Sequence, residues 1–328
     1  MIFSLSQYLN SRRIQNSFIL YFDYLYSCIL KKPILRAKPI SASIEPANFC
    51  NLRCPECPTG KKEFEKENKK LTFDLFKKIL NPLLPELTYL NLYFQGEPFL
   101  NEEIFSMIQY AHSKKIYTSI STNGHFLDSD NIKKILSSNL DHLIISVDGS
   151  NQKSYELYRI GGNFDTVING IKELVQKKKE AKSKTPFIEL QFLVLHTNED
   201  EIEEMKKLAK KLSVDKLQLK SAQVYDYENG NNLIPTKSKY SRYKRLPNGK
   251  FIIKKRLRNR CWRQWSSVVI TAQGELLPCC FDKKEKYSFG NIFEDYFEDL
   301  WLGGKAMNFR QEVLLNRKDI TICTNCTE

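Results

Sequence analysis

Three cysteines stand close together near the start of the chain, at Cys50, Cys54 and Cys57 in the stretch CNLRCPEC. An iron–sulfur cube is normally held by four thiolates. Three thiolates at this C-x3-C-x2-C spacing would bind three irons and leave the fourth iron without a protein ligand. An open coordination position distinguishes a reactive metal site from a closed structural one, so the spacing predicts a reactive iron–sulfur centre.

The cysteine content favours metal binding over disulfide bonding. The chain has nine cysteines, an odd number, and eight of them fall in two groups. The N-terminus lacks a charged start followed by a small-residue cleavage site, so no secretory signal is visible. The cysteines are therefore interpreted as metal ligands in a reducing cytoplasm. Cys28, which lies outside both groups, is predicted to be a small buried hydrophobe.

The first cysteine group belongs to a strand–helix alternation. Strands are predicted at 40–45, 89–94, 117–122, 142–147, 187–195 and 216–220. Helices are predicted at 73–80, 128–138, 164–179 and 199–212, and Asn101 is predicted to cap another that opens with Glu102 and Glu103. Such an alternation forms a parallel sheet with right-handed crossovers. Six repeats are too few for a closed eight-stranded barrel, so the expected fold is α/β. It is a partial (β/α)6 TIM-like barrel followed by a small cysteine-rich C-terminal extension.

Polar motifs follow the first four predicted strands. After the cysteine loop they are Gly96-Glu97-Pro98, Asn123-Gly124 and Asp148-Gly149. In parallel α/β folds the carboxyl ends of the strands carry the site. We therefore expect the cysteine loop and these motifs to gather on one rim of the barrel.

With these motifs the chain resembles the radical SAM superfamily over roughly residues 40 to 328. The resemblance implies that Cys50, Cys54 and Cys57 bind a [4Fe–4S] cluster whose open iron chelates the amino and carboxylate groups of S-adenosylmethionine. An electron from the cluster would cleave the sulfonium and give a 5′-deoxyadenosyl radical, which abstracts hydrogen from a substrate. A zinc knuckle using Cys54 and Cys57 is the alternative, but it would leave Cys50 and the rim motifs unexplained.

The same resemblance implies which residues bind S-adenosylmethionine. The stretch YFQGEP at 93–98 is similar to the Gly-Gly-Glu-Pro motif of the family, with Gln95 in place of the first glycine. The implied cofactor-binding residues are Gly96, Glu97, Ser121, Asn123, Asp148 and Arg159. Glu97 would face the methionine amine, and the Arg159 fork would pair with the methionine carboxylate.

Two of these assignments have structural alternatives, and one position departs from the family. Asp148 could be a turn residue before Gly149, and Arg159 could form a surface ion pair. Glu56 stands where the family commonly has an aromatic residue that touches the adenine. That contact is therefore not expected here, although the cysteine spacing is unaffected.

The C-terminal cysteines resemble the SPASM and twitch extensions of radical SAM enzymes, which carry auxiliary [4Fe–4S] clusters. By position the implied ligands are Cys261, Cys279, Cys323 and Cys326, with Cys280 left over. The expected cofactors are two [4Fe–4S] clusters, one SAM-binding and one auxiliary, and S-adenosylmethionine itself. The auxiliary cluster would accept an electron from the substrate radical or support the structure. A structural zinc on the same four thiolates is the alternative.

The expected domain organisation has four parts. They are a basic aromatic leader (1–39), the radical SAM partial barrel (40–220), a basic irregular linker (221–260) and the auxiliary-cluster extension (261–328). The apolar stretch 18–30 is too short to span a membrane. It is predicted to be a helix that packs against the barrel wall rather than one that lies on a membrane surface.

The chain carries 51 basic and 38 acidic residues, a formal charge of +13. Such a surface attracts anionic partners. Between residues 237 and 260 basic residues are dense, aromatic residues are interleaved and acids are absent, but no RNA- or DNA-binding motif accompanies them. Nucleic-acid binding is therefore not expected, and most of the charge is interpreted as a solvated surface.

The leading hypothesis is a cytoplasmic radical SAM enzyme that takes an electron from a donor such as a flavodoxin or ferredoxin. Its substrate would be a peptide or a sugar-like small molecule. The short leader favours the small molecule, because peptide-modifying relatives often carry an N-terminal recognition domain. The alternative is a non-catalytic zinc or iron–sulfur scaffold that binds an acidic partner.

Overall fold

The computed structural model describes residues 6–63 and 67–327. The fold is built around a nine-stranded sheet. Its strand order is β11-β10-β9-β1-β2-β3-β4-β5-β6. The barrel strands are β1 (Ser41–Ile44), β2 (Tyr89–Asn91), β3 (Tyr117–Thr122), β4 (His142–Ser146), β5 (Phe187–Val194) and β6 (Lys216–Ser221). Each pairs in parallel with the next. The predicted α/β partial barrel is confirmed.

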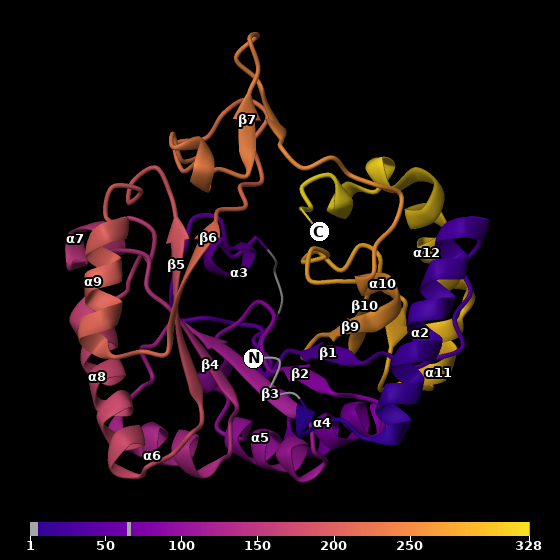
Figure 1. Ribbon diagram of the computed structural model, residues 1–328, viewed down its shortest axis with the longest axis horizontal. Coiled ribbons are helices and arrows are strands. Elements are labelled where there is room, and N and C mark those ends of the chain that lie inside the picture. Colours follow the sequence, from indigo (N-terminus) through magenta and orange to yellow (C-terminus); the bar gives the residue numbers. More distant parts are fainter. Residues whose placement is uncertain (1–5, 64–66, 328) are drawn as a thin grey trace.

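Helices cover the outer side of this curved sheet (Figure 1). They are α4 (Phe73–Leu80), α5 (Ile104–Ser113), α6 (Ser129–Ser137), α8 (Phe164–Glu180) and α9 (Ile202–Leu212). The short helices α3 (Pro58–Lys61) and α7 (Gln152–Glu156) lie in the loops. Apolar side chains on alternate strand positions, such as Leu90, Ile120 and Leu143, are fully buried in the main core. Asp128 fixes the start of α6 by accepting hydrogen bonds from two backbone N–H groups.

The helix after β2 begins later than the sequence predicts. Asn101 Oδ1 accepts a hydrogen bond from the Glu103 nitrogen at 2.9 Å, just before α5 begins at Ile104. Its amide nitrogen donates to the carbonyls of Pro46 and Leu71, each at 2.8 Å. Glu103 accepts a hydrogen bond from the first backbone N–H of α4 at 2.8 Å. Asn101 therefore caps the turn that leads into α5 and also binds neighbouring segments. The prediction that the helix opens with Glu102 and Glu103 was wrong, because both residues precede Ile104.

The C-terminal part continues the barrel sheet. It contains β9 (Ser267–Ile270), β10 (Glu275–Leu277), β11 (Gly290–Asn291), α10 (Arg263–Ser266), α11 (Phe297–Leu302) and α12 (Gly304–Asn316). Strand β9 pairs in parallel with β1, from Ser41 opposite Ser267 to Ile44 opposite Ile270. The segment 221–260, predicted to be irregular, contains an antiparallel hairpin of β7 (Tyr243–Arg245) and β8 (Phe251–Ile253).

The N-terminal helix α2 (Ser11–Leu30) packs against the barrel, as predicted. Arg13 donates from its guanidinium to the carbonyls of Pro85 and Lys114 at 3.0 and 3.1 Å. The irregular segment 31–40 that follows is held by two indoles of the extension, since Trp265 donates to the Ile34 carbonyl and Trp301 to the Ala37 carbonyl. Across residues 6–63 and 67–327, none of the helices combines the length and apolarity needed to cross a bilayer.

Candidate functional site

The cysteine loop follows β1 and is folded tightly on itself. Cys57 precedes the short helix α3, which opens with Pro58. A Cβ atom at Gly60 would lie 2.7 Å from the Cys54 nitrogen and 2.8 Å from its oxygen, so only glycine permits this approach. Cys54 is buried, and Cys50 and Cys57 are half-buried beside it in one apolar cluster. The loop therefore brings the three thiols together, as the spacing predicts.

Hydrogen-bond donors and one cation face these thiols. The Leu52 backbone nitrogen lies 3.4 Å from the Cys50 sulfur, and Asn123 Nδ2 lies 3.6 Å from it. Arg159 Nη1 lies 3.8 Å from the Cys54 sulfur. Burial raises the pKa of Cys50 to about 11. Burial also raises the pKa of Cys54, and the positive charge of Arg159 partly lowers it. Metal coordination removes such protons, and the donors suit sulfurs that carry negative charge.

Among the described residues, no three Cys, His, Asp or Glu side chains converge closely enough to hold a single metal ion. A [4Fe–4S] cube bonds each thiolate to a different iron and does not require that convergence. The sulfur donors and their surroundings therefore fit the cluster that the spacing predicts.

Glu97 joins the ends of β2 and β3 beneath the rim. Its buried carboxylate accepts hydrogen bonds from Thr122 Oγ1 at 2.7 Å, the Asn123 nitrogen at 2.8 Å and the Phe99 nitrogen at 3.2 Å. Burial raises the pKa of Glu97 to about 7, and these hydrogen bonds act in the opposite direction. The carboxylate that is expected to face the methionine amine thus accepts three hydrogen bonds from the protein itself.

Gln95 and Gly96, the two residues before Glu97, contact segments far away in the sequence. A Cβ atom at Gly96 would lie 1.9 Å from the Ala47 carbonyl oxygen, which explains the glycine. Gln95, which replaces the first glycine of the family motif, donates from Nε2 to the Lys283 carbonyl at 3.0 Å. It thereby ties the barrel rim to the C-terminal extension. Its buried Oε1 has no hydrogen-bond partner in the described structure and can accept one from a ligand.

Asn123 is held by a histidine that the sequence analysis did not single out. His125 Nε2 accepts a hydrogen bond from the Asn163 nitrogen at 2.8 Å, so the proton of the neutral ring is on Nδ1. Nδ1 then donates to Asn123 Oδ1 at 3.0 Å. This turns Asn123 Nδ2 toward Asn51 Oδ1, at 2.7 Å, and toward Cys50. Burial lowers the pKa of His125 and favours the neutral ring.

Asp148 and Arg159 form a buried pair next to the second cysteine. Arg159 Nε donates to Asp148 Oδ2 at 2.5 Å, and Asp148 Oδ1 accepts from the Leu193 nitrogen at 2.7 Å. The alternatives of a plain turn residue and a surface ion pair do not describe these contacts, because Asp148 is fully buried and Arg159 mostly buried. Ser121 is half-buried on β3, directly before Thr122, whose hydroxyl donates to Glu97.

Glu56 has a different role from the aromatic residue that the family commonly places there. Its Oε2 accepts a hydrogen bond from the Tyr225 nitrogen at 2.9 Å, and its Oε1 lies 3.5 Å from Asn231 Nδ2. The side chain therefore ties the cysteine loop to the segment after β6.

The four predicted auxiliary cysteines also gather. Burial and the neighbouring thiols of Cys280, Cys261 and Cys323 raise the pKa of Cys279. Cys323 in turn lies near Cys261 and Cys326, and burial raises the pKa of Cys323 to about 11. Cys280 turns toward Arg263, whose Nη1 lies 3.9 Å from its sulfur.

The sequence analysis missed Arg317, which is buried among these cysteines. Its Nη2 lies 3.4 Å from the Cys326 sulfur, and its Nη1 donates to the Arg260 carbonyl at 2.5 Å. The positive charge lowers the pKa of Cys323, against the effect of burial. Nothing in the pattern RKD distinguishes this arginine from the many exposed ones.

Three cavities adjoin the cysteine groups, among them one of about 1130 Å³ that Cys261 and Arg317 line. One of about 390 Å³ is lined by Cys50, Gln95 and Glu45 at the rim. Another of about 300 Å³ lies between the barrel strands and the extension, and its lining includes Ser43, Asn91, Tyr93, Cys279 and Cys280.

Comparison with known families agrees with this geometry. The model described as the radical SAM superfamily matches residues 44–214, more than half of the chain. The chain belongs to the radical SAM superfamily. The model described as an iron–sulfur cluster-binding domain, SPASM, matches residues 261–327 of this radical SAM enzyme. Radical SAM domains bind a [4Fe–4S] cluster and S-adenosylmethionine, and SPASM domains bind auxiliary iron–sulfur clusters.

Several known proteins are similar to this radical SAM enzyme. A curated relative from Pyrococcus furiosus, named as a tungsten-containing aldehyde ferredoxin oxidoreductase cofactor-modifying protein, is 27% identical over 314 residues, which covers 87% of this chain and 86% of the relative. BtrN, solved with AdoMet and 2-DOIA, is 18% identical with a TM-score of 0.56 and covers 90% of this chain and 95% of BtrN. Streptococcus suis SuiB, solved with its precursor peptide SuiA, is 15% identical with a TM-score of 0.64 and covers 89% and 72% of the two chains.

The raised pKa of Glu97 predicts a pH-dependent stability. Since its pKa lies near 7 in the folded chain and at its ordinary 4.5 when unfolded, the folded state holds an extra proton between these values. This contribution is complete below pH 4.5 and is lost as the pH rises to 7. In urea titrations of the apoprotein, the unfolding free energy should fall by about 2–3 kcal/mol more between pH 5 and 7.5 in wild type than in Glu97→Gln. Glu102→Gln, at an exposed ion pair, should follow the wild type, and equal slopes for wild type and Glu97→Gln would contradict the prediction.

The contacts of Arg317 predict a specific effect on the second cysteine group. In a background where Cys50, Cys54 and Cys57 are alanine, Arg317→Gln should lose auxiliary iron to a chelator about tenfold faster or more, because it removes the cation beside the sulfurs. Arg258→Gln is the matched control, since only its backbone carbonyl contacts Arg317. Equal rates of iron loss in the two variants would show that Arg317 does not support the site.

Proposed function

We propose that this radical SAM enzyme takes hydrogen from a polar, sugar-like small molecule that binds between the barrel strands and the C-terminal cysteines. The observation that carries the proposal is the cavity of about 300 Å³ lined by Ser43, Asn91, Cys279 and Cys280. Its volume lies at the small end of ligand pockets. A cavity of this size suits a small molecule or a single side chain.

The lining of this cavity favours a hydroxylated ligand. Ser41 and Ser43 of β1 and Asn91 of β2 contribute hydroxyl and amide groups. Asn91 Nδ2 donates to Ser43 Oγ at 3.1 Å, while its buried Oδ1 has no partner in the described structure. A buried polar atom without a partner is costly, and a ligand hydroxyl would satisfy it.

Cys279 of the proposed auxiliary site lines this cavity, and Cys50 of the proposed SAM-binding site lines the neighbouring rim cavity. Cys50, Cys54 and Cys57 would hold the SAM-binding [4Fe–4S] cluster, and Cys261, Cys279, Cys323 and Cys326 would hold the auxiliary cluster. When bound, the cluster and S-adenosylmethionine supply an electron and an adenosyl radical that takes hydrogen from the substrate. The proposed rim for S-adenosylmethionine consists of Gly96, Glu97, Ser121, Asn123, Asp148 and Arg159. Within it, Glu97 and Asp148 hold neighbouring groups in place by the contacts described above.

Three further observations support the proposal. Because Cys279 lines the same cavity, the auxiliary site adjoins the proposed substrate, as acceptance of an electron from the substrate would require. The charge of +13 favours an acidic one-electron donor such as a flavodoxin or ferredoxin. The crystal structure of BtrN with 2-DOIA supports a small-molecule substrate. Because SuiB was solved with the peptide SuiA, a peptide is the second candidate for the substrate.

The first test is formation of 5′-deoxyadenosine by anaerobically reconstituted protein with dithionite. Wild type should bind about eight irons per chain and form 5′-deoxyadenosine. With Cys50, Cys54 and Cys57 replaced by alanine, iron should fall to about four and the product should be absent. Cys28→Ala, outside both groups, should behave as wild type. Fully loaded wild type that forms no 5′-deoxyadenosine would favour the scaffold alternative.

The second test concerns the substrate. Deuterated polyols and amino sugars should transfer deuterium to 5′-deoxyadenosine, and Asn91→Leu should raise KM about tenfold or more by removing a buried hydrogen-bonding group. Asn169→Leu, on the exposed side of α8, should leave KM unchanged. Transfer from deuterated peptides but from none of the small molecules would overturn the substrate assignment without affecting the radical chemistry.

A further inference from the structure

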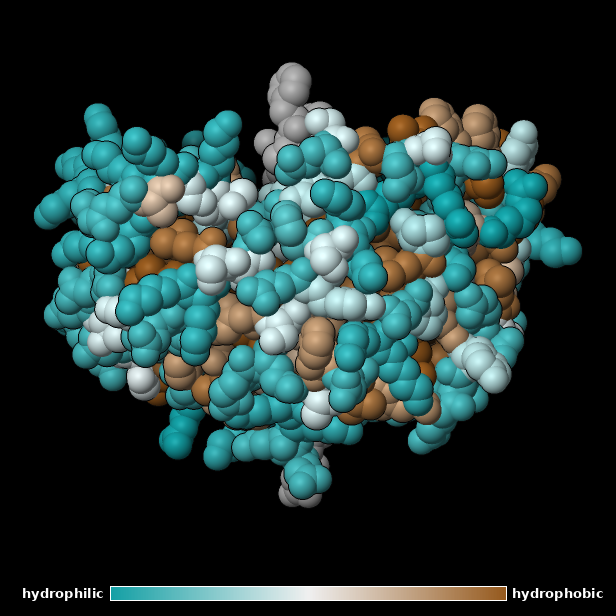
Figure 2. Space-filling model, turned by 90° about the horizontal axis from the view of Figure 1, so that it is seen from below, coloured by the Kyte–Doolittle hydropathy of each residue, from teal (hydrophilic) through white to brown (hydrophobic). Residues whose placement is uncertain are grey.

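Helix α2 buries mostly polar side chains and exposes apolar ones, which is the opposite of an ordinary surface helix. Its buried residues are Arg13, Asn16, Leu20, Asp23 and Ser27, of which only Leu20 is apolar. Large apolar and aromatic side chains lie instead on its exposed side: Phe18, Tyr21, Phe22, Tyr26, Ile29 and Leu30, each 47–66% exposed. Figure 2 shows brown side chains along the right-hand rim, on the side where Figure 1 draws α2, whereas the left-hand rim is mostly teal. Contiguous apolar surface of this kind marks an interaction site.

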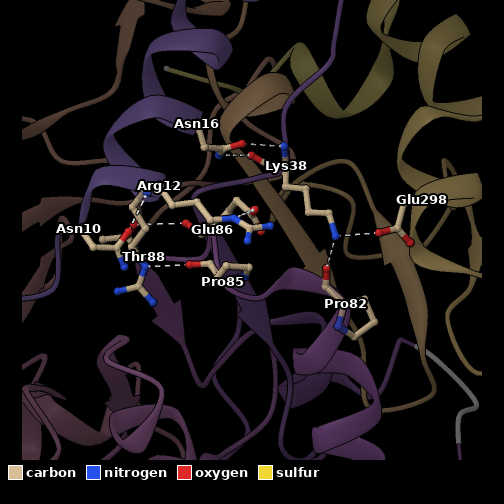
Figure 3. Close-up of polar contacts among 10 residues, drawn as sticks. Asn10, Arg12, Asn16, Lys38, Pro82, Pro85, Glu86, Thr88 and Glu298 are labelled. Atoms are coloured by element: carbon tan, nitrogen blue, oxygen red, sulfur yellow. Dashed lines mark hydrogen bonds and ion pairs between the residues drawn. The ribbon is translucent and has the colours of Figure 1, made fainter.

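Specific polar contacts fix this orientation. Asn16 exchanges two hydrogen bonds with the Lys38 backbone, and Arg12 pairs with Glu86 at 2.8 Å (Figure 3). Asp23, fully buried, pairs with Arg36 at 2.7 Å. Rotating the helix to bury its apolar side would break these contacts and leave buried charges unpaired. The apolar side therefore faces outward because the polar side is bound.

A strongly basic groove continues this apolar surface. It has a volume of about 1130 Å³, and its lining includes Lys255, Arg256, Arg258 and Arg260 together with Tyr24 and Trp262. The Trp262 ring lies 5.3 Å from that of Tyr24 and 6.3 Å from that of Tyr21, so the groove and α2 share an aromatic border. No acidic residue occurs between positions 237 and 263. Lys31 and Lys32 add exposed positive charge at the end of the helix.

We propose that the exposed side of α2 rests on the surface of an anionic lipid bilayer. An interfacial helix buries an apolar face at the headgroup boundary, and tyrosine and tryptophan favour that depth. Lysine and arginine beside it are attracted to acidic lipid headgroups. A second copy of the chain would bring the same positive charge to this surface, whereas an anionic bilayer complements both its apolar and its basic parts. The enzyme would lie on the membrane, and none of the helices within residues 6–63 and 67–327 would cross it.

Vesicle sedimentation of the full chain tests this proposal. Wild type should sediment with phosphatidylcholine vesicles that contain about one-third phosphatidylglycerol and much less with phosphatidylcholine alone. Phe18→Ser with Ile29→Ser should weaken binding about tenfold or more, because both side chains are exposed and lose apolar contact only with lipid. Lys255→Gln with Arg256→Gln should reduce the preference for phosphatidylglycerol.

Matched controls lie on other surfaces. Leu157→Ser with Tyr296→Ser removes two exposed apolar side chains, 54% and 80% accessible, and Lys172→Gln with Lys179→Gln removes two exposed charges from α8. Both pairs should bind vesicles as wild type does. Circular dichroism should show the same helix content in every variant. Absence of sedimentation, or equal binding by the Phe18/Ile29 variant, would overturn the proposal. If wild type did not bind vesicles but self-associated with increasing concentration, and the Phe18/Ile29 variant did not self-associate, the surface would be assigned to a protein partner instead.

Discussion

The parallel pairing of β1 with β9 determines the arrangement of this molecule. Four residue pairs, from Ser41 with Ser267 to Ile44 with Ile270, join the first barrel strand to the first strand of the extension. The first cysteine loop leaves the end of β1, and the C-terminal cysteines lie before β9 and after β10. A shift of one residue in this register would turn every side chain of β9 to the opposite face. The two cysteine groups are therefore placed relative to each other by backbone hydrogen bonds rather than by a flexible linker.

The rim is rigid because its polar groups bind one another. Glu97 receives hydrogen bonds from the end of β3, and Asp148 holds Arg159 next to Cys54. His125 fixes the side-chain amide of Asn123 beside Cys50. Such contacts hold side chains in defined rotamers before any ligand binds, which lowers the cost of binding. Gln95 extends the network to the C-terminal part through the Lys283 carbonyl.

The sequence predicted the features that depend on local pattern. The strand 117–122 and the helix 73–80 have the predicted bounds, because hydrophobic periodicity determines them locally. Thr72 also fixes the start of the helix, since its hydroxyl accepts a hydrogen bond from the Leu75 nitrogen. The gathering of the cysteine loop with Glu97 and Asn123 followed from their places at strand ends. The helix after β2 begins at Ile104 rather than at Glu102, and Asn101 caps the turn before it while its amide nitrogen binds other segments. Arg317, His125 and the addition of β9 to the barrel depend on segments far apart in sequence, which single-sequence periodicity does not reveal.

The two indole contacts of the extension also bear on how the chain matures. Trp265 and Trp301 hold the carbonyls of Ile34 and Ala37, more than 200 positions earlier in the sequence. During synthesis, the segment after α2 therefore cannot form its hydrogen bonds with Trp265 and Trp301 until the extension has been made. Long-range contacts of this kind form late, and apolar surface left uncovered in the meantime exposes a nascent chain to aggregation. The segment 31–40 is thus completed by the extension, and truncation of the extension would leave that segment without part of its support.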